Sequence, residues 1–393
     1  MHISSRLDAI SESKTLAITS RAAELRAEGK DIISLSAGEP DFPTPAPVAE
    51  AGIEAIREGK TRYTSVPGIP ELRKRITEHL ARDFDLEYDW KEICVTASVK
   101  AGLTLSLLAL AEPGDKVVLP APYWVSYPEV VGLSRACPAI LPCSEANGFI
   151  PTEAELTTAL SADGVRGIIL NSPSNPSGAV WSESQLTNLV EICAENDCWI
   201  LSDEIYARVT YDDIPSISPA NIPGGKERTI VLNGLSKVYA MTGWRIGYVA
   251  APRELIQAIT ALQSHALGNP PTISQYAAME AWSDRGVDYP AEMLQAFAER
   301  RAWICDAIDR LPGFTLHRPG GAFYVFPGVE AILEERGIDD LTLAALLLDE
   351  AGVAVVPGTA FGAPGHIRLS FAASMEQIQE AMRRIATWLE GKG

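Results

Sequence analysis

A lysine and a serine stand side by side in the stretch 229–248, which reads TIVLNGLSKVYAMTGWRIGY. The branched apolar residues 230–232 predict a buried strand, and a turn follows it directly. Ser236 and Lys237 therefore lie where this strand ends, and open α/β sheets bind their ligands at that edge. Most lysines are solvated surface charges, so the pair alone also fits an ordinary exposed loop.

An arginine gives the pair a chemical context. Arg245 comes eight residues after Lys237, inside a second apolar run, 244–251, that again predicts a strand. A lysine can form an imine with an aldehyde, and the planar guanidinium of an arginine suits a phosphate dianion. Together with the hydroxyl of Ser236, these groups predict a site for an aldehyde cofactor that carries a phosphate, namely pyridoxal 5'-phosphate.

Composition limits the classes of function. The chain has 393 residues, enough for two domains, and 47% of them are hydrophobic. The net charge of −18 argues against nucleic acid or an anionic membrane as partner, since either needs a concentrated basic patch. The six cysteines form no CxxC pair and no metal-ligand spacing with the five histidines, so we expect no metal site. Reduced thiols and the lack of a long apolar run predict a cytoplasmic protein.

Short apolar runs alternate with amphipathic segments along most of the chain. The predicted buried strands are 93–96, 116–119, 165–170, 199–202 and 229–232. This alternation predicts an α/β fold in which helices cover both faces of a mainly parallel sheet. From about residue 284 the pattern changes, because a long helix, 292–310, leads into short strands and helices that predict a smaller α/β unit.

Polar residues follow the ends of successive predicted strands. Asn175 lies in the turn NSPSNPSG, whose prolines stiffen the backbone. Asp203 ends the next strand, and Tyr206 follows it three residues later. A carboxylate there can pair with a pyridine nitrogen, or it can cap a following helix. The presence of Asn175 and Lys237 at neighbouring strand ends favours the first interpretation.

Three further positions have both a functional and a structural interpretation. Ser98, with the two residues after it, opens a helix, and unpaired amides at a helix start favour an anion. Trp124 either stacks on a flat cofactor or fills the core. Arg368 lies inside the predicted strand HIRLSF, where a guanidinium needs either a substrate carboxylate or a structural glutamate.

These motifs resemble those of a known family. The segments LSKVYAMTGWRIGY, NSPSNPSG, SDEIY and HIRLSFA are similar to those of the class I aminotransferases, which belong to fold type I of the pyridoxal-phosphate enzymes. The resemblance extends along nearly the whole chain. It implies a homodimer and a seven-stranded sheet in a large cofactor domain, 46–283. It also implies an N-terminal arm that contributes to the small domain, 1–45, and a small C-terminal domain, 284–393.

The resemblance also implies a role for each residue around the cofactor. Lys237 forms the imine and moves the proton, Asp203 fixes the ring nitrogen, and Asn175 and Tyr206 hold the phenolic oxygen. Trp124 stacks on the ring. The phosphate contacts implied in this way come from Ser98, Val99, Lys100, Ser236, Arg245 and, across the dimer interface, Tyr63 in the segment YTSVPGIPELR.

Substrate contacts follow from the same resemblance. Arg368 grips the α-carboxylate of the substrate, with Trp124, Asn175 and the amide of Gly38 nearby. One subgroup of aspartate aminotransferases binds the side-chain carboxylate of the substrate with an arginine shortly before a GNPP segment. The corresponding segment in this sequence, QSHALGNPP, contains no arginine. The other, bacterial-type subgroup is more similar to this sequence. Its resemblance implies that Thr15 and Lys100 bind the side-chain carboxylate of the substrate.

The hypothesis is therefore an aspartate:2-oxoglutarate aminotransferase of amino-acid metabolism. Aromatic amino acids or prephenate remain open as substrates, and so does β-elimination on the same fold. A regulator that only binds ligand is a further alternative, but such proteins carry an added DNA-binding domain for which this chain has no spare length.

Overall fold

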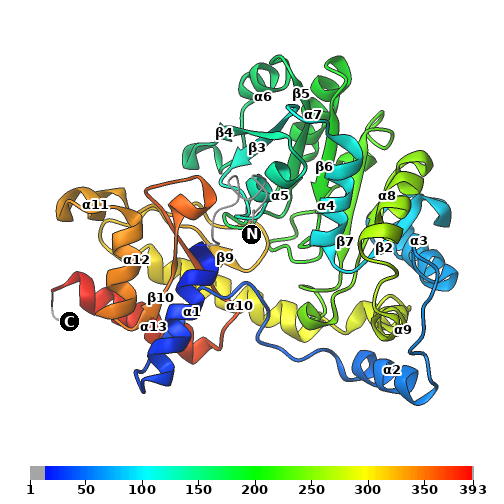
Figure 1. Cartoon of the computed structure of the whole chain (residues 1–393). Helices are drawn as coiled ribbons and strands as arrows, with labels where there is room; N and C mark the ends of the chain where they lie inside the picture. The colour runs from blue at the N-terminus through cyan, green and yellow to red at the C-terminus, as the bar shows by residue number, and fades with distance from the viewer. Residues whose placement is uncertain (1–13, 392–393) are drawn as a thin grey trace, which may run out of the picture.

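The computed structural model describes residues 14–391, which are built around one seven-stranded sheet (Figure 1). Strand β8 runs antiparallel to both of its neighbours, and the other adjacent pairs are parallel. The predicted mainly parallel sheet is thus confirmed. Across the sheet the strands are β2 (Ile93–Thr96), β8 (Gly247–Ala250), β7 (Thr229–Gly234), β6 (Trp199–Asp203), β5 (Val165–Asn171), β3 (Lys116–Ala121) and β4 (Cys137–Pro142).

Helices cover both faces of this sheet. Successive side chains of a strand point to opposite faces, so Ile230 and Leu232 of β7 enter one core while Val231 enters another. Burial on both faces explains why the strands read as continuous apolar runs. One face is covered by α4 (Val99–Leu110), α5 (Tyr127–Leu133) and α8 (Arg253–Ala266). The other is covered by α3 (Pro70–Phe84), α6 (Glu153–Leu160), α7 (Glu183–Glu195) and α9 (Thr272–Ala281), and α2 (Ala46–Arg57) packs on α9.

Local sequence signals explain where several helices begin. Ser182 and Gln185 form a capping box at the start of α7, and Thr152 and Glu155 do the same for α6. Each box satisfies two backbone amides that the first helical turn leaves unpaired. None of the helices in the described part of the chain is long and apolar enough to cross a membrane.

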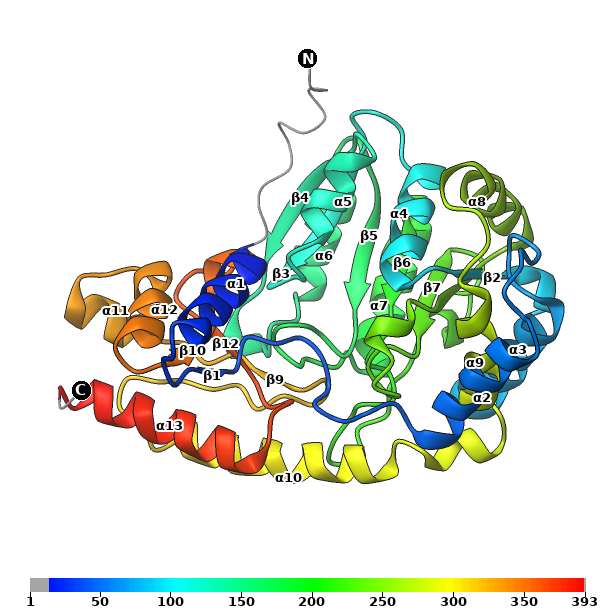
Figure 2. The ribbon, with the colours of Figure 1, turned by 60° about the horizontal axis from the view of Figure 1, so that its bottom comes forward.

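The C-terminal part of the chain forms smaller sheets beside α10 (Ala291–Ile308). Strand β1 pairs in parallel with β10, which joins the N-terminal segment to the C-terminal part. Figure 2 shows α13 lying along α10 below these sheets. The strands are β1 (Ile33–Ser34), β9 (Tyr324–Val325), β10 (Val353–Ala354), β11 (Val356–Pro357) and β12 (Ile367–Ser370). The helices are α1 (Lys14–Ala27), α11 (Glu330–Arg336), α12 (Asp340–Asp349) and α13 (Met375–Leu389).

One local prediction was wrong. Arg245 does not lie within a strand, because a short 3-10 helix, Thr242–Trp244, precedes it and its own backbone is left-handed at φ 54°. The strand begins only at Gly247.

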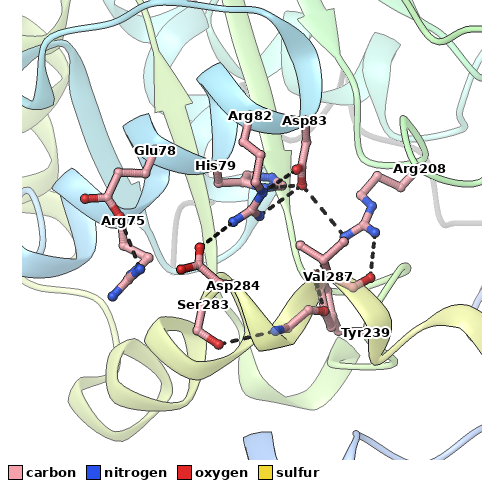
Figure 3. A network of polar contacts seen from close by, with 11 residues as sticks. Arg75, Glu78, His79, Arg82, Asp83, Arg208, Tyr239, Ser283, Asp284 and Val287 are labelled. Atoms are coloured by element: carbon pink, nitrogen blue, oxygen red, sulfur yellow. Dashed lines mark hydrogen bonds and ion pairs between the residues drawn. The ribbon is translucent and has the colours of Figure 1, made fainter.

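A network of polar contacts secures the loops that follow β6 and β7 (Figure 3). Arg208 donates to the hydroxyl of Tyr239 and to the carbonyl of Val287, each across 2.9 Å. Asp83, near the end of α3, lies 3.9 Å from the same guanidinium. Tyr239 comes two residues after Lys237, so the network fixes the backbone next to that lysine against the segment that enters α10.

Candidate active site

A cavity of about 370 Å³ opens at the carboxyl ends of β5, β6 and β7. This volume is within the range of small-molecule sites, roughly 300–1,000 Å³. The structure brings almost all of the predicted site residues into its wall. These are Gly38, Ser98, Val99, Lys100, Trp124, Asn175, Asp203, Tyr206, Ser236, Lys237, Arg245 and Arg368.

Lys237 reaches the cavity from the loop after β7. Its Nζ donates a hydrogen bond to the carbonyl oxygen of Gly38 across 2.6 Å. Burial lowers the pKa of the Lys237 amine to about 8, and Glu39 opposes this shift. A larger fraction of the amine is therefore unprotonated near neutral pH than for an exposed lysine, which is the form that acts as nucleophile or base.

Asp203 ends β6 and is 3% exposed. Its Oδ2 accepts a hydrogen bond from the Tyr127 hydroxyl at 2.8 Å, and its Oδ1 accepts one from the backbone amide of Ile205 at 3.3 Å. Burial raises the pKa of the carboxyl to about 6, against these hydrogen bonds and the charge of Lys237. No α-helix follows for it to cap before the next described strand, so a cationic ligand group is the partner that suits it.

Asn175 and Arg368 contact each other in the wall of the same cavity as Asp203. The side-chain oxygen of Asn171 accepts a hydrogen bond from the backbone amide of Asn175 at 2.8 Å. The side-chain nitrogen of Asn171 donates to the backbone carbonyl of Asp203 at 2.8 Å. Arg368 Nη1 donates to Asn175 Oδ1 at 3.0 Å, and Nη2 donates to the carbonyl of Ser36 at 2.7 Å.

Arg368 is only 2% exposed, and its Nε has no hydrogen-bond partner. Among the described side chains no carboxylate forms an ion pair with it, so the alternative of a structural glutamate is not realised. A buried guanidinium without an anion is costly. Its fork is therefore available for a carboxylate that enters the cavity.

The other end of the cavity is cationic and more open. Ser98 is the N-cap of α4, and its hydroxyl oxygen accepts from the amide of Ala101 at 3.2 Å. Arg245 and Lys100 are exposed, and both line this end. A Cβ on Gly247 would come within 2.7 Å of the Val99 amide nitrogen, so only glycine lets β8 approach the start of α4 this closely. The helix start and two cations suit a phosphate.

Trp124 forms an aromatic wall of the cavity. Its ring packs edge-on against Tyr127 with centroids 5.4 Å apart, and Lys100 Nζ lies 4.7 Å from the Trp124 centroid. The side chain is only partly buried, unlike a residue of the core. A flat ring bound beside it would be shielded from water on that face.

Comparisons with known proteins show which family the chain belongs to. The sequence profile of the family described as aminotransferase class I and II matches residues 30–385. The chain belongs to this family. A protein of Aquifex aeolicus named "probable aspartate/prephenate aminotransferase" is 43% identical over 390 residues, 99% of this chain and 98% of that one. The aspartate aminotransferase of Geobacillus stearothermophilus is 42% identical over the full length of both. The crystal structure of the aspartate aminotransferase from Rhizobium meliloti superposes with a TM-score of 0.94, at 40% identity over 98% of each chain.

One predicted site residue of this aminotransferase lies outside the cavity, and the side chain of another is not described. Tyr63 is 97% exposed on the surface, and its predicted contact needs a second subunit. Thr15 belongs to the first turn of α1, and its side chain lies outside the part that the structure describes.

Sequence reasoning missed three residues that the aminotransferase places at the site. Asn171 carried a usable signal, since it ends a predicted strand in the same way as Asp203. Tyr127 and Tyr324 carried none, because they come from the start of a helix and from a strand of another sheet. Both are fully buried apart from their contact with the cavity.

Proposed function

We propose that this aminotransferase uses pyridoxal 5'-phosphate to exchange amino groups between aspartate and 2-oxoglutarate. The observation that carries the proposal is the enclosure of three groups in one cavity: the amine of Lys237, the buried carboxyl of Asp203 and the buried guanidinium of Arg368. The printed names of the relatives, aspartate or aspartate/prephenate aminotransferase, support the choice of substrate.

The residues present fit the cofactor. At the open end of the cavity, Ser236 and Arg245 lie beside the start of α4, a donor set that suits the phosphate. Asp203 would face the ring nitrogen, Trp124 would cover a ring face, and Asn175 with Tyr206 would hold the phenolic oxygen. When bound, pyridoxal phosphate supplies an aldehyde that joins amines and a ring that withdraws electrons from them.

Lys237 has two tasks in this proposal. Its amine would hold the cofactor, and when free the same amine would take the proton from the substrate α-carbon and later return a proton. The lowered pKa of the Lys237 amine, about 8, supports the second task, because a base works best when its pKa is near the operating pH. Asp203, held by Tyr127, keeps a negative charge where a cationic ring nitrogen would lie.

Different residues are proposed to bind the two carboxylates of the substrate. Arg368 binds the α-carboxylate through its planar fork, near the backbone of Gly38. Lys100, together with Thr15, is proposed for the side-chain carboxylate, since the segment before GNPP has Ser264 and His265 and lacks an arginine.

The proposal includes the assembly and the location of the enzyme. Two copies would place the exposed Tyr63 of one at the phosphate of the other. Within a chain, 46–283 would form the large domain, and 284–393 with the arm 1–45 the small one, which the pairing of β1 with β10 supports. All six cysteines are unpaired, which supports the cytoplasm.

Visible absorbance and donor kinetics test the proposal together. The purified protein, saturated with pyridoxal phosphate, should absorb in the visible range and change spectrum when aspartate is added, whereas Lys237→Ala should lack the absorbance of the lysine-linked cofactor and should not exchange amino groups. Fast turnover of aspartate and glutamate supports the dicarboxylate version, and faster turnover of aromatic donors or prephenate replaces it. Release of ammonia and pyruvate would instead indicate β-elimination.

A further inference from the structure

Tyr324 joins the two halves of the site, although neither the motifs nor the proposed mechanism assign it a task. It lies on β9, is fully buried and lines the cavity. Its hydroxyl lies 2.8 Å from the hydroxyl of Tyr206. Its ring lies under the guanidinium of Arg368, with 4.5 Å between Arg368 Cζ and the ring centroid.

The number of hydroxyl protons determines which of the two phenols donates the hydrogen bond between them. Each hydroxyl carries a single proton. If Tyr206 donates its proton to a ligand in the cavity, only the proton of Tyr324 remains for the bond between the phenols. Burial raises the pKa of both hydroxyls, so both protons stay in place over the working pH range. Tyr324 is then the donor and Tyr206 the acceptor.

The fold keeps Tyr324 in one position. Its backbone pairs with Ser370 of β12, the strand that carries Arg368, so the backbone of Tyr324 is held in place relative to that strand. A Cβ on Gly38 would come within 3.2 Å of its hydroxyl oxygen, which shows how closely the loop packs on it. A donor held this firmly restricts the orientation of the hydroxyl that accepts from it.

Packing alone does not explain the hydroxyl. Phe323 and Phe326, on either side in the same segment, are just as deeply buried and have no polar atom. The contact between the Arg368 guanidinium and the ring needs only an aromatic face, which phenylalanine also provides. The hydroxyl of Tyr324 is therefore the part that the site uses through Tyr206.

We propose that Tyr324 is a positioning residue, which donates its hydroxyl proton to Tyr206 and thereby aims the proton of Tyr206 at the phenolic oxygen of the cofactor. The inference rests on the proposed function. A hydroxyl that accepts a hydrogen bond is a stronger donor, so Tyr324 also strengthens the contact that Tyr206 makes.

A pH titration of the visible absorbance of the cofactor-loaded enzyme tests this role. The titration follows the proton on the nitrogen of Lys237, which the negative phenolic oxygen attracts. The charged groups that face this nitrogen are Glu39, Asp203, Arg245 and Arg368, and all stay unchanged in the variants. A weaker bond from Tyr206 leaves more negative charge on the oxygen and should move the midpoint to higher pH.

A double-mutant cycle gives the expected result. Tyr324→Phe should move the midpoint of the titration to higher pH. The proton concentration at the midpoint should fall by roughly three- to tenfold, which is the effect expected from the loss of one neutral hydrogen bond. Tyr206→Phe should move the midpoint in the same direction and further. Adding Tyr324→Phe to Tyr206→Phe should then change nothing more. An unmoved midpoint in Tyr324→Phe, or an equal shift in both backgrounds, would overturn the inference.

Tyr211→Phe is the matched control. Tyr211 is a buried tyrosine outside the cavity, and its hydroxyl donates to the carbonyl of Ala322 at 2.6 Å, so it also loses one buried hydrogen bond. The midpoint of the absorbance titration of Tyr211→Phe should stay at the wild-type value. If the unmutated protein shows no visible absorbance with pyridoxal phosphate, the proposed function fails. Normal absorbance with an unshifted Tyr324→Phe titration refutes only the role of Tyr324.

Discussion

Arg368 Nη1 donates to the side-chain oxygen of Asn175 across 3.0 Å, although 193 positions separate the two residues. The arginine belongs to β12, and the asparagine follows β5 of the large sheet. The bond therefore joins the proposed carboxylate site to the proposed cofactor site. Such a link fixes the two sites relative to each other, which reduces the cost of orienting a substrate against the cofactor.

Replacing Arg368 should affect the substrate more than the cofactor. Lysine keeps the charge of Arg368 but loses the planar fork, so Arg368→Lys should lower kcat/KM for aspartate by about 10- to 100-fold, mainly through KM. Steady-state kinetics measure this, and visible absorbance checks that the cofactor is still bound. Arg301→Lys, on α10 and paired with Asp212 at 2.6 Å, is the control and should leave KM unchanged. An unchanged KM in Arg368→Lys would contradict the assignment.

Ser98 has a backbone conformation that favours glycine, with φ 109° and ψ 160°. A side chain in this region costs about 1–3 kcal/mol, whereas replacing a serine N-cap by glycine costs only a few tenths. The relief of strain therefore exceeds the loss of the cap. Ser98→Gly should raise the free energy of unfolding of the cofactor-free protein by roughly 1 kcal/mol, seen as a higher Tm at a fixed protein concentration.

Ser98→Ala separates the two effects at this position. Alanine keeps the backbone strain and loses the hydrogen bond from Ala101, so this variant should be less stable than wild type by about 1 kcal/mol. The order of Tm should then be glycine, serine, alanine. A glycine variant that unfolds below the alanine variant would show that the strain is not relieved.

The residues of the site that follow strand ends could be predicted, and those brought in by packing could not. Lys237 and Asp203 come directly after apolar runs, and parallel strands align their carboxyl ends, so their meeting follows from order along the chain. Tyr324 reaches Tyr206 only because a separate sheet packs against the first. The left-handed backbone at Arg245 depends on a turn that the apolar pattern does not specify.

Glu204 gives the protein a pH-dependent stability. Its carboxyl is buried and accepts from the hydroxyls of Ser202 and Ser218 at 2.8 and 2.6 Å. Burial raises the pKa of Glu204 to about 7, from about 4.5 in the unfolded chain. Between these values the folded state holds a proton that the unfolded state has lost, so stability falls as pH rises through this window.

Glu204→Gln should remove this dependence, because glutamine keeps the shape and cannot ionise. Relative to wild type, the free energy of unfolding of the variant should rise by about 1.4 kcal/mol for each pH unit between roughly 4.5 and 7. Above this range the difference between the two proteins should stay constant. Thermal unfolding at pH 5, 6, 7 and 8 measures the difference. A constant Tm difference across these pH values would refute the raised pKa of Glu204.

Arg300 holds the loop that carries Gly38. From α10 it donates to both carboxylate oxygens of Asp41, at 2.7 and 3.0 Å, and its guanidinium lies 5.2 Å from the centroid of the Phe42 ring. Lysine can make only one of the two parallel bonds. Because the carbonyl of Gly38 accepts from Lys237, a looser loop should disturb the cavity.

Arg300→Lys should therefore raise KM for aspartate by roughly three- to tenfold and speed amide hydrogen exchange in the segment 36–43, as expected when about 1–2 kcal/mol of local stability is lost. Asp41→Asn removes the same pair from the other side and should have the same two effects. The double variant should be no worse than either single one, since all three break one interaction. Additive losses in the double variant, or exchange that stays slow in both single variants, would show that this pair does not hold the loop.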